Sequence, residues 1–193
     1  MGIGYISLIM KDFDIRKVAN AIIFFLDNKV SYLTKTKFIK MMYFADKYHF
    51  ENYGRSIFGD TYIKLPHGPI PTLSLSIINN DCDNADVKEY TDEFLKYVTP
   101  ACTYNNITVF SKNTEFNHKI FSQSEIEALR KIAEEFSLDN ADEISEKSHL
   151  TKAYQKASLY NVISEEDMAE DNGEYVSFWN NEFSNLESIL THC

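Results

Sequence analysis

The sequence predicts a mainly α fold: a compact single-domain helical bundle with a small β element of two or three strands. Apolar residues recur at helical spacing in several stretches, whereas only two short stretches have the composition of strands. Aromatic residues make up 14% of the 193 residues, which favours a hydrophobic core over disorder. We therefore expect one domain over residues 13–193, preceded by a loosely docked leader, residues 1–12.

The first two helices are predicted to form an αα-hairpin. Asp12 or Asp14 can cap a helix that runs to about Leu26. Thr34 can cap a second helix that runs to about Phe50, because its side-chain oxygen can accept a free amide of the first turn. This second helix is apolar around most of its circumference, which is typical of a helix at the centre of a core. Its polar arc consists of four residues: Thr36, Lys37, Lys40 and Lys47.

Two polar residues, Asp46 and His49, fall inside the apolar arc of the second helix. A buried carboxylate or imidazole is costly unless it is paired and hydrogen-bonded. Asp46 and His49 are three residues apart and could pair, and His67, Arg55 or His149 could extend them into a buried polar network. Two interpretations stay open: a functional site in which Asp46 orients His49, or a polar anchor that fixes the helix against a loop.

Glycines and prolines divide the segment after this helix. Gly54 is expected to end the helix with a positive φ. Residues 61–65 alternate well enough for a short strand, and residues 107–110 form the other predicted strand, which could pair with it. Three prolines between 66 and 71 should prevent regular hydrogen bonding there, and Gly68 permits a close backbone approach. This stiff loop is either a purely structural break between elements or a surface that contacts a partner.

The remaining chain is predicted to be mostly helical. Residues 73–78 could form a helix or a strand, and residues 87–98 indicate a weak helix. Ser122 to Glu125 match a capping box, which opens a helix that should end near Leu138. Three shorter helical segments are expected to follow, near 140–148, 153–157 and 164–167. A variable C-terminal helix within 166–193 has an apolar stripe: Trp179, Phe183, Leu186 and Leu190.

The net charge of −10 is unevenly distributed along the chain. Residues 33–71 carry six basic and three acidic residues, whereas residues 120–193 carry sixteen acidic and five basic ones. An acidic protein is a poor nucleic-acid ligand, so no direct nucleic-acid binding is expected; the acidity suits a basic protein partner or serves solubility alone. Without an apolar run of ~18 residues or a signal peptide, we expect no membrane partner and a cytoplasmic location.

The sequence shows no motif for a metal, a cofactor or a catalytic centre. Three scattered cysteines, Cys82, Cys102 and Cys193, lack the spacing of a zinc site. Nucleotide-binding, nucleophile-elbow and metalloprotease motifs do not occur. We therefore assign no catalytic residue, no metal and no cofactor. An enzyme that uses a pocket of histidine and aspartate side chains stays open as an alternative, and its residues would come from Asp46, His49, His67 and His149.

The stretch 33–71 resembles the signature of the Panacea domain, found in SocA-like antitoxins and also described as phage-associated. The matching pieces are Leu33-Thr34-Lys35, Met42-Tyr43-Phe44-Ala45-Asp46, Tyr53-Gly54-Arg55-Ser56-Ile57, Gly59-Asp60 and Gly68-Pro69-Ile70. Weaker similarity at Phe121-Ser122, Ser148-His149, Tyr154 and Ala157 extends the resemblance to about residues 13–165. Residues 72–118 and the tail after 165 depart from the pattern.

The resemblance implies a bacterial or prophage-encoded antitoxin that acts by binding, with a toxin encoded beside it as its partner. One family member is a proteolytic adaptor that delivers its toxin to an AAA+ protease, so an adaptor function is the alternative and such a protease a second partner. The family is not known for catalysis. We expect the polar arc and the proline loop to contact the partner through seven residues: Lys37, Lys40, Lys47, Arg55, His67, Pro69 and Ile70.

Overall fold

The computed structural model describes residues 13–81, 85–103, 105 and 107–170 of the chain. Its elements are α2 (Ile15–Asp27), α3 (Lys35–Tyr53), β1 (Tyr62–Leu65), β2 (Gly68–Pro71), α4 (Thr72–Asn79), α5 (Ala85–Tyr97), β3 (Val98–Cys102), β4 (Thr108–Lys112), the 3-10 helix η1 (His118–Ile120), α6 (Gln123–Phe136), α7 (Ala141–His149), α8 (Lys152–Lys156) and α9 (Glu165–Met168). The described part is mainly α, with two small antiparallel sheets of two strands each. The predicted leader and the apolar stripe of the C-terminal helix lie outside the described residues.

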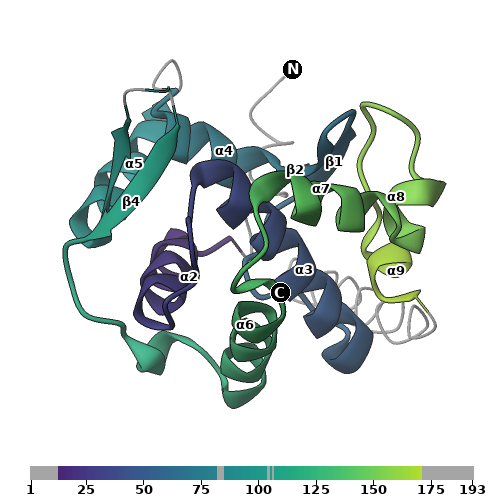
Figure 1. The fold of residues 1–193 in the computed structure, drawn as a ribbon, viewed down its shortest axis with the longest axis horizontal. Helices are drawn as coiled ribbons and strands as arrows, with labels where there is room; N and C mark the ends of the chain where they lie inside the picture. Colours follow the sequence, from purple (N-terminus) through teal and green to yellow (C-terminus); the bar gives the residue numbers. More distant parts are fainter. Residues whose placement is uncertain (1–12, 82–84, 104, 106, 171–193) are drawn as a thin grey trace, which may run out of the picture.

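Helix α3 lies in the middle of the molecule, with α2 and α5 toward one end and α8 and α9 toward the other (Figure 1). It packs against α6, α7, α9 and β2. The predicted cap is confirmed, because the Thr34 side chain accepts a hydrogen bond from the Lys37 amide at 3.2 Å. Gly54 ends the helix in the left-handed conformation with φ 71°, also as predicted. Local capping thus sets both ends of the central helix.

Helix α2 begins after Asp14, whose carboxylate accepts from the Arg16 amide at 2.9 Å. α2 is buried over most of its length and packs against α5 and α6. The capping box at Ser122 and Glu125 is confirmed at the start of α6, which ends two residues earlier than predicted. A second capping box, formed by Asn140 and Glu143, opens α7. The predicted helices of this region are therefore present with boundaries shifted by a few residues.

The first sheet is a tight hairpin in which Leu65 is opposite Gly68. The expectation that prolines would prevent regular pairing here is wrong. Pro69 and Pro71 occupy alternate positions of β2, while the Thr72 amide donates to the Thr61 carbonyl oxygen at 3.0 Å. Antiparallel partners alternate between hydrogen-bonded and non-hydrogen-bonded pairs. The prolines thus fall at positions where the ladder needs no amide.

The second sheet pairs β3 with β4 over residues 98–102 and 108–112. The predicted strand at 107–110 is confirmed, but its predicted pairing with residues 61–65 is wrong. Its partner β3 precedes it by a short connection, and closing a short loop costs less entropy than joining strands about forty residues apart. The two predicted strands, β1 and β4, therefore lie in separate sheets, and no three-stranded sheet forms among the described residues.

The chain between α8 and α9 runs along the outer edge of β1. The Tyr160 amide donates to the Lys64 carbonyl oxygen at 2.8 Å, and the Ile163 amide donates to the Tyr62 carbonyl oxygen at 2.8 Å. Val162 and Ile63 form an isolated antiparallel bridge between these two bonds. Residues 160–163 therefore fasten the connection between α8 and α9 to β1.

Two apolar clusters form the core of the described residues. The larger cluster draws on α2, α3 and α6, and includes Phe25, Phe38 and Phe136. The smaller cluster joins α3 to β1, α8 and α9 and includes Tyr43 and Tyr62, whose ring centroids are 5.5 Å apart. Within the described ranges no helix is long and apolar enough to cross a membrane.

Candidate functional site

Asp46 is fully buried on α3 and holds the loop that follows this helix. Its Oδ1 accepts from the Ile57 amide at 2.6 Å, the Phe58 amide at 3.3 Å and the Ser56 hydroxyl at 3.0 Å. Its Oδ2 accepts from the Tyr62 hydroxyl at 2.8 Å. Burial raises the pKa of the Asp46 carboxyl to about 7, although the four donors oppose the shift. This carboxyl therefore acts as a hub that positions four neighbouring groups.

His49 is also fully buried and bonds to the same loop. Its Nδ1 lies 2.7 Å from the Arg55 carbonyl oxygen, which can only accept, so Nδ1 carries the proton. In the neutral ring Nε2 then accepts from the Ser124 hydroxyl at 3.0 Å. Burial lowers the pKa of His49, which agrees with a neutral ring. Both ring nitrogens are thus engaged in holding α3, its loop and α6 together.

The predicted pairing of Asp46 with His49 is wrong. Within the part of the chain that the structure describes, no hydrogen bond joins these two side chains, and none joins either to His149. His149 instead stacks on Tyr154 with ring centroids 4.7 Å apart, and its Nε2 is buried without a partner there. The alternative of a polar anchor between helix and loop is the one that the geometry bears out. Asp46 and His49 are packed in the core, where they form no open cleft.

The three lysines of the predicted polar arc do not face solvent. Lys37, Lys40 and Lys47 are 0%, 2% and 8% exposed, so the expectation that these lysines are accessible to a partner is wrong. Carbonyl or carboxylate oxygens of the same chain accept hydrogen bonds from their amines. Helical periodicity cannot show which loops return to cover a polar arc.

Each of these lysines ties another segment to α3. The Lys37 amine donates to the Ser31 carbonyl oxygen at 2.7 Å and the Ser137 carbonyl oxygen at 3.4 Å. The Lys47 amine pairs with Glu51 and, at 2.8 Å, with Glu170. These two lysines therefore fix segments that precede α3, follow α6 and follow α9.

Lys40 and Gly68 hold the β1–β2 hairpin close to α3. The Lys40 amine donates to the Pro69 carbonyl oxygen at 2.8 Å, and burial lowers the pKa of this amine to about 8. Gly68 has φ +97°, and a Cβ placed on it would lie 2.7 Å from the Ser148 Oγ and 2.8 Å from the Lys40 Nζ. Only glycine fits this position without displacement of its neighbours. The β1–β2 hairpin therefore packs closely against α3 and α7.

The other predicted contact residues differ in accessibility. Pro69 is buried and Ile70 is half-buried against the larger apolar cluster. Arg55 and His67 are exposed. The Arg55 Nη1 lies 3.7 Å from Glu125 Oε1, and the His67 carbonyl oxygen accepts from the Ser145 hydroxyl at 2.6 Å. A contact of Arg55 or His67 with a partner stays a prediction.

Asp60 has a structural role that the sequence did not reveal. Its Oδ2 accepts from the Ser74 amide at 2.7 Å and its Oδ1 from the Leu73 amide at 3.1 Å. Pro71, at the start of α4, has no side-chain acceptor, so Asp60 supplies the cap from a distant position in the chain. Burial raises the pKa of Asp60. Capping predictions from sequence consider only residues next to the helix start, so they cannot find a cap from a residue twelve positions earlier.

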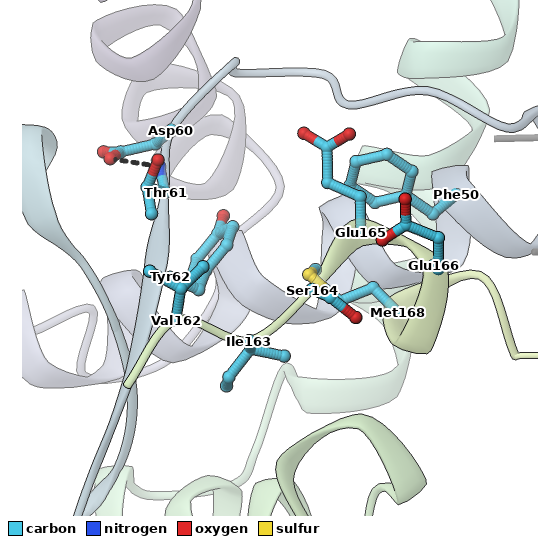
Figure 2. Close-up of a pocket in the computed structure, with 10 residues that line it drawn as sticks. All are labelled: Phe50, Asp60, Thr61, Tyr62, Val162, Ile163, Ser164, Glu165, Glu166 and Met168. Atoms are coloured by element: carbon cyan, nitrogen blue, oxygen red, sulfur yellow. Dashed lines mark hydrogen bonds between the residues drawn. The ribbon is translucent and has the colours of Figure 1, made fainter. Parts of the chain in front are cut away.

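A pocket of about 280 Å³ opens between β1, the end of α3 and α9. Figure 2 shows Phe50, Glu165 and Glu166 grouped on one side of this pocket and Tyr62 and Val162 on the other. The ten lining residues, which we call the α9 pocket, are Phe50, Asp60, Thr61, Tyr62, Val162, Ile163, Ser164, Glu165, Glu166 and Met168. Its lining is apolar at depth and acidic at the surface.

The α9 pocket could not be found from the sequence. Residues 162–168 of its lining lie about a hundred positions after Phe50 and residues 60–62, and residues 164–167 indicated only a helix start. Among the residues that the structure describes, no group of three or more His, Cys, Asp or Glu side chains is arranged to hold a metal ion.

Comparison with known proteins identifies the family. The family model described as antitoxin SocA-like, Panacea domain, matches residues 38–155, which is more than half of the chain. Searches of curated proteins and of solved structures gave no significant match. Membership of an antitoxin-like family suggests a non-enzymatic role and a toxin partner. The chain belongs to the SocA-like antitoxin family, whose Panacea domain covers most of the described fold.

Proposed function

We propose that this protein is an antitoxin, encoded in a bacterial chromosome or a prophage, that binds and neutralises a toxin encoded beside it. The family match over residues 38–155 is the observation that carries the proposal. The net charge of −10 supports it, because an acidic surface complements a basic protein partner. The burial of Asp46 and His49 also favours binding over catalysis, since neither side chain is accessible to a substrate.

The hydrogen bonds of the signature region bear on where the toxin would bind. Asp46, Asp60 and Lys40 all use their polar atoms to hold loops or helices of the same chain. Side chains engaged in this way are poor candidates for partner contact, because a partner would have to break internal bonds first. The proposed contact surface therefore consists of exposed residues around this scaffold, including Arg55 and His67.

A co-expression experiment tests the proposal. The chain and the product of the adjacent gene are placed under separate inducers in a bacterial host, and growth is followed after each induction. We expect the neighbour alone to arrest growth and the chain to restore it. A copy with a frameshift that keeps the transcript but makes no protein is the matched control. Arrest without rescue, or rescue by the frameshifted copy, would contradict neutralisation by the protein.

The same cells distinguish simple binding from delivery to a protease. The toxin is tagged, protein synthesis is stopped, and the decay of the toxin is followed with and without the chain. Neutralisation by binding predicts rescue with an unchanged toxin half-life. A half-life that shortens only in the presence of both the chain and an AAA+ protease would support the adaptor function instead.

A further inference from the structure

We propose that the contact between the β1–β2 hairpin and helices α7 and α8, which we call the hairpin junction, is sensitive to acid: an uncharged His149 keeps it closed, and protonation of this side chain loosens it. This regulatory device goes beyond the proposed antitoxin function and does not depend on it. The hairpin also holds the connection between α8 and α9 through residues 160–163, so the junction would control how firmly this part of the chain is attached.

Hydrogen bonds on both sides of His149 hold the hairpin to α7 and α8. From α7, the Ser145 hydroxyl donates to the His67 carbonyl oxygen at 2.6 Å. From α8, the Tyr154 hydroxyl donates to the Leu65 carbonyl oxygen at 2.7 Å. His149 is the last residue of α7, so it comes between these two contacts in the chain, and its ring stacks on Tyr154. A change in the charge of His149 therefore acts at the centre of the hairpin junction.

The ring of His149 has no place for a second proton in the closed junction. His149 is half-buried as a whole, but its Nε2 is buried and has no hydrogen-bond partner within the described residues. An imidazolium carries a proton on both ring nitrogens, so Nε2 would become a charged donor without an acceptor. Burial of an unpaired charge is costly. The closed junction thus favours the neutral ring.

The charges that face His149 also oppose its protonation. Three positive groups act on it from neighbouring elements: Lys40 of α3, Lys64 of β1 and His67 of the hairpin turn. Glu146, on the preceding turn of α7, acts in the opposite direction. Burial, followed by the three positive groups, lowers the pKa of His149 below its usual 6.5. Lys40 is 2% exposed, so solvent screens its charge little.

Stacking on Tyr154 offers little compensation for a charge on His149. A cation over a tyrosine ring is normally attracted to it. The Lys64 amine, however, already lies 4.5 Å from the centroid of the Tyr154 ring. The same amine ties the hairpin to the end of α8, because it donates to the Ala157 carbonyl oxygen at 2.9 Å. A charged His149 would repel this amine and weaken a further contact of the hairpin junction.

The lowered pKa sets the direction of the pH effect. Below pH 6.5 an opened junction lets His149 take up a proton that the closed junction excludes. The opened form then binds more protons, so the closed form is stable above pH 6.5 and loses stability as pH falls further. Asp46 acts in the opposite direction on the whole fold, because its raised pKa favours a proton in the folded state. Acid should therefore open the junction without global unfolding.

Amide hydrogen exchange of the full chain, followed by NMR at about pH 7.5 and 5.5 and corrected for intrinsic rates, tests the proposal. The Tyr160 and Lys64 amides report on the junction, because they bond between β1 and residues 160–163. The Asn28 amide, at the end of α2, is the internal reference. In the wild type, protection of Tyr160 and Lys64 should fall severalfold at the lower pH, while that of Asn28 stays unchanged. His149→Gln should remove this loss, since an amide side chain does not titrate.

A second histidine provides the matched control. His118 is exposed on η1, and His118→Gln should keep the wild-type loss of protection. An equal loss in His149→Gln would overturn the proposal, because another group would then be responsible. A wild type that keeps its protection at Tyr160 and Lys64, or that loses it equally at Asn28, would also overturn it.

A titration of the wild type keeps the proposal testable if His149→Gln does not fold. The ring resonances of His149 are followed by NMR between about pH 4.5 and 8. A midpoint below 6.5, at the pH where Tyr160 and Lys64 lose protection, supports the proposal. A midpoint at or above 6.5 overturns it, because the closed junction would then accept the proton.

Discussion

The pH dependence of folding stability provides a direct test of the Asp46 hub. Asp46→Asn keeps the size of the side chain and removes its ability to ionise. In the wild type, burial raises the pKa of Asp46 from 3.8 to about 7. Between these two values the folded protein keeps a proton on Asp46 that the unfolded chain has released. The folded state therefore binds more protons, and the free energy of unfolding should fall as pH rises across this window.

The size of the effect follows from the pKa difference. One pKa unit corresponds to about 1.4 kcal/mol, so a shift of roughly three units sets an upper limit of about 4 kcal/mol. Below about pH 4 both states are protonated, and above about pH 7 both are ionised, so the slope should vanish outside the window. Asp46→Asn lacks this contribution. The stability difference between wild type and variant should therefore move in favour of the variant as pH rises from about 4.5 to 7.5.

Urea unfolding followed by circular dichroism, at four pH values across this range, measures the difference in the free energy of unfolding between the wild type and Asp46→Asn. Asp92→Asn, which removes an exposed carboxylate, controls for the loss of one charge. A difference that stays constant with pH would refute a raised pKa at Asp46. A difference that moves in favour of the wild type as pH rises would show that the four donors hold the carboxylate in its ionised form.

Three further variants test the contacts that position the loops. Gly68→Ala should lower the free energy of unfolding by about 1–3 kcal/mol, measured in urea, because its Cβ would clash with Ser148 and Lys40. Between about pH 8 and 10.5 the unfolded chain binds a proton that the folded Lys40 amine has lost, so the free energy of unfolding of the wild type should rise with pH. Lys40→Met should abolish this rise, as measured by urea unfolding. Ser122→Ala should cost about 1 kcal/mol and increase amide exchange in the first turn of α6, since it removes a capping box. Unchanged unfolding curves or exchange rates would contradict the corresponding contact.

Local signals in the sequence predicted much of the fold. Thr34, Gly54 and the capping box at Ser122 act on residues within three or four positions, so their chemistry can be interpreted without knowledge of the tertiary structure. The apolar periodicity of residues 34–50 likewise predicted a central helix, and α3 packs on several sides. These features depend on neighbours along the chain, which the sequence specifies directly.

Contacts between distant segments account for what the sequence could not predict. Lys37 and Lys40 of the polar arc are buried because residues 31, 69 and 137 supply carbonyl oxygens that accept hydrogen bonds from their amines. Asp60 caps a helix that begins twelve residues later, and the α9 pocket joins residues from three segments. Periodicity can indicate that a side chain is polar, but it cannot indicate which distant carbonyl group will meet it.

Several residues of the signature have a structural role. Asp46, Asp60 and Gly68 each fix a loop or a helix end by contacts within the chain. The family match ends at residue 155, before the residues between 162 and 168 that form one side of the α9 pocket.

Native mass spectrometry of the co-expressed pair is the most direct test of the central claim, that this chain neutralises its toxin by stable binding. The chain is purified through a tag, and the complex with the product of the adjacent gene is transferred intact into the spectrometer. Neutralisation by stable binding predicts a species whose mass is the sum of both proteins in a fixed ratio. Separate masses of the two proteins, in cells whose growth the chain has restored, would contradict neutralisation by binding.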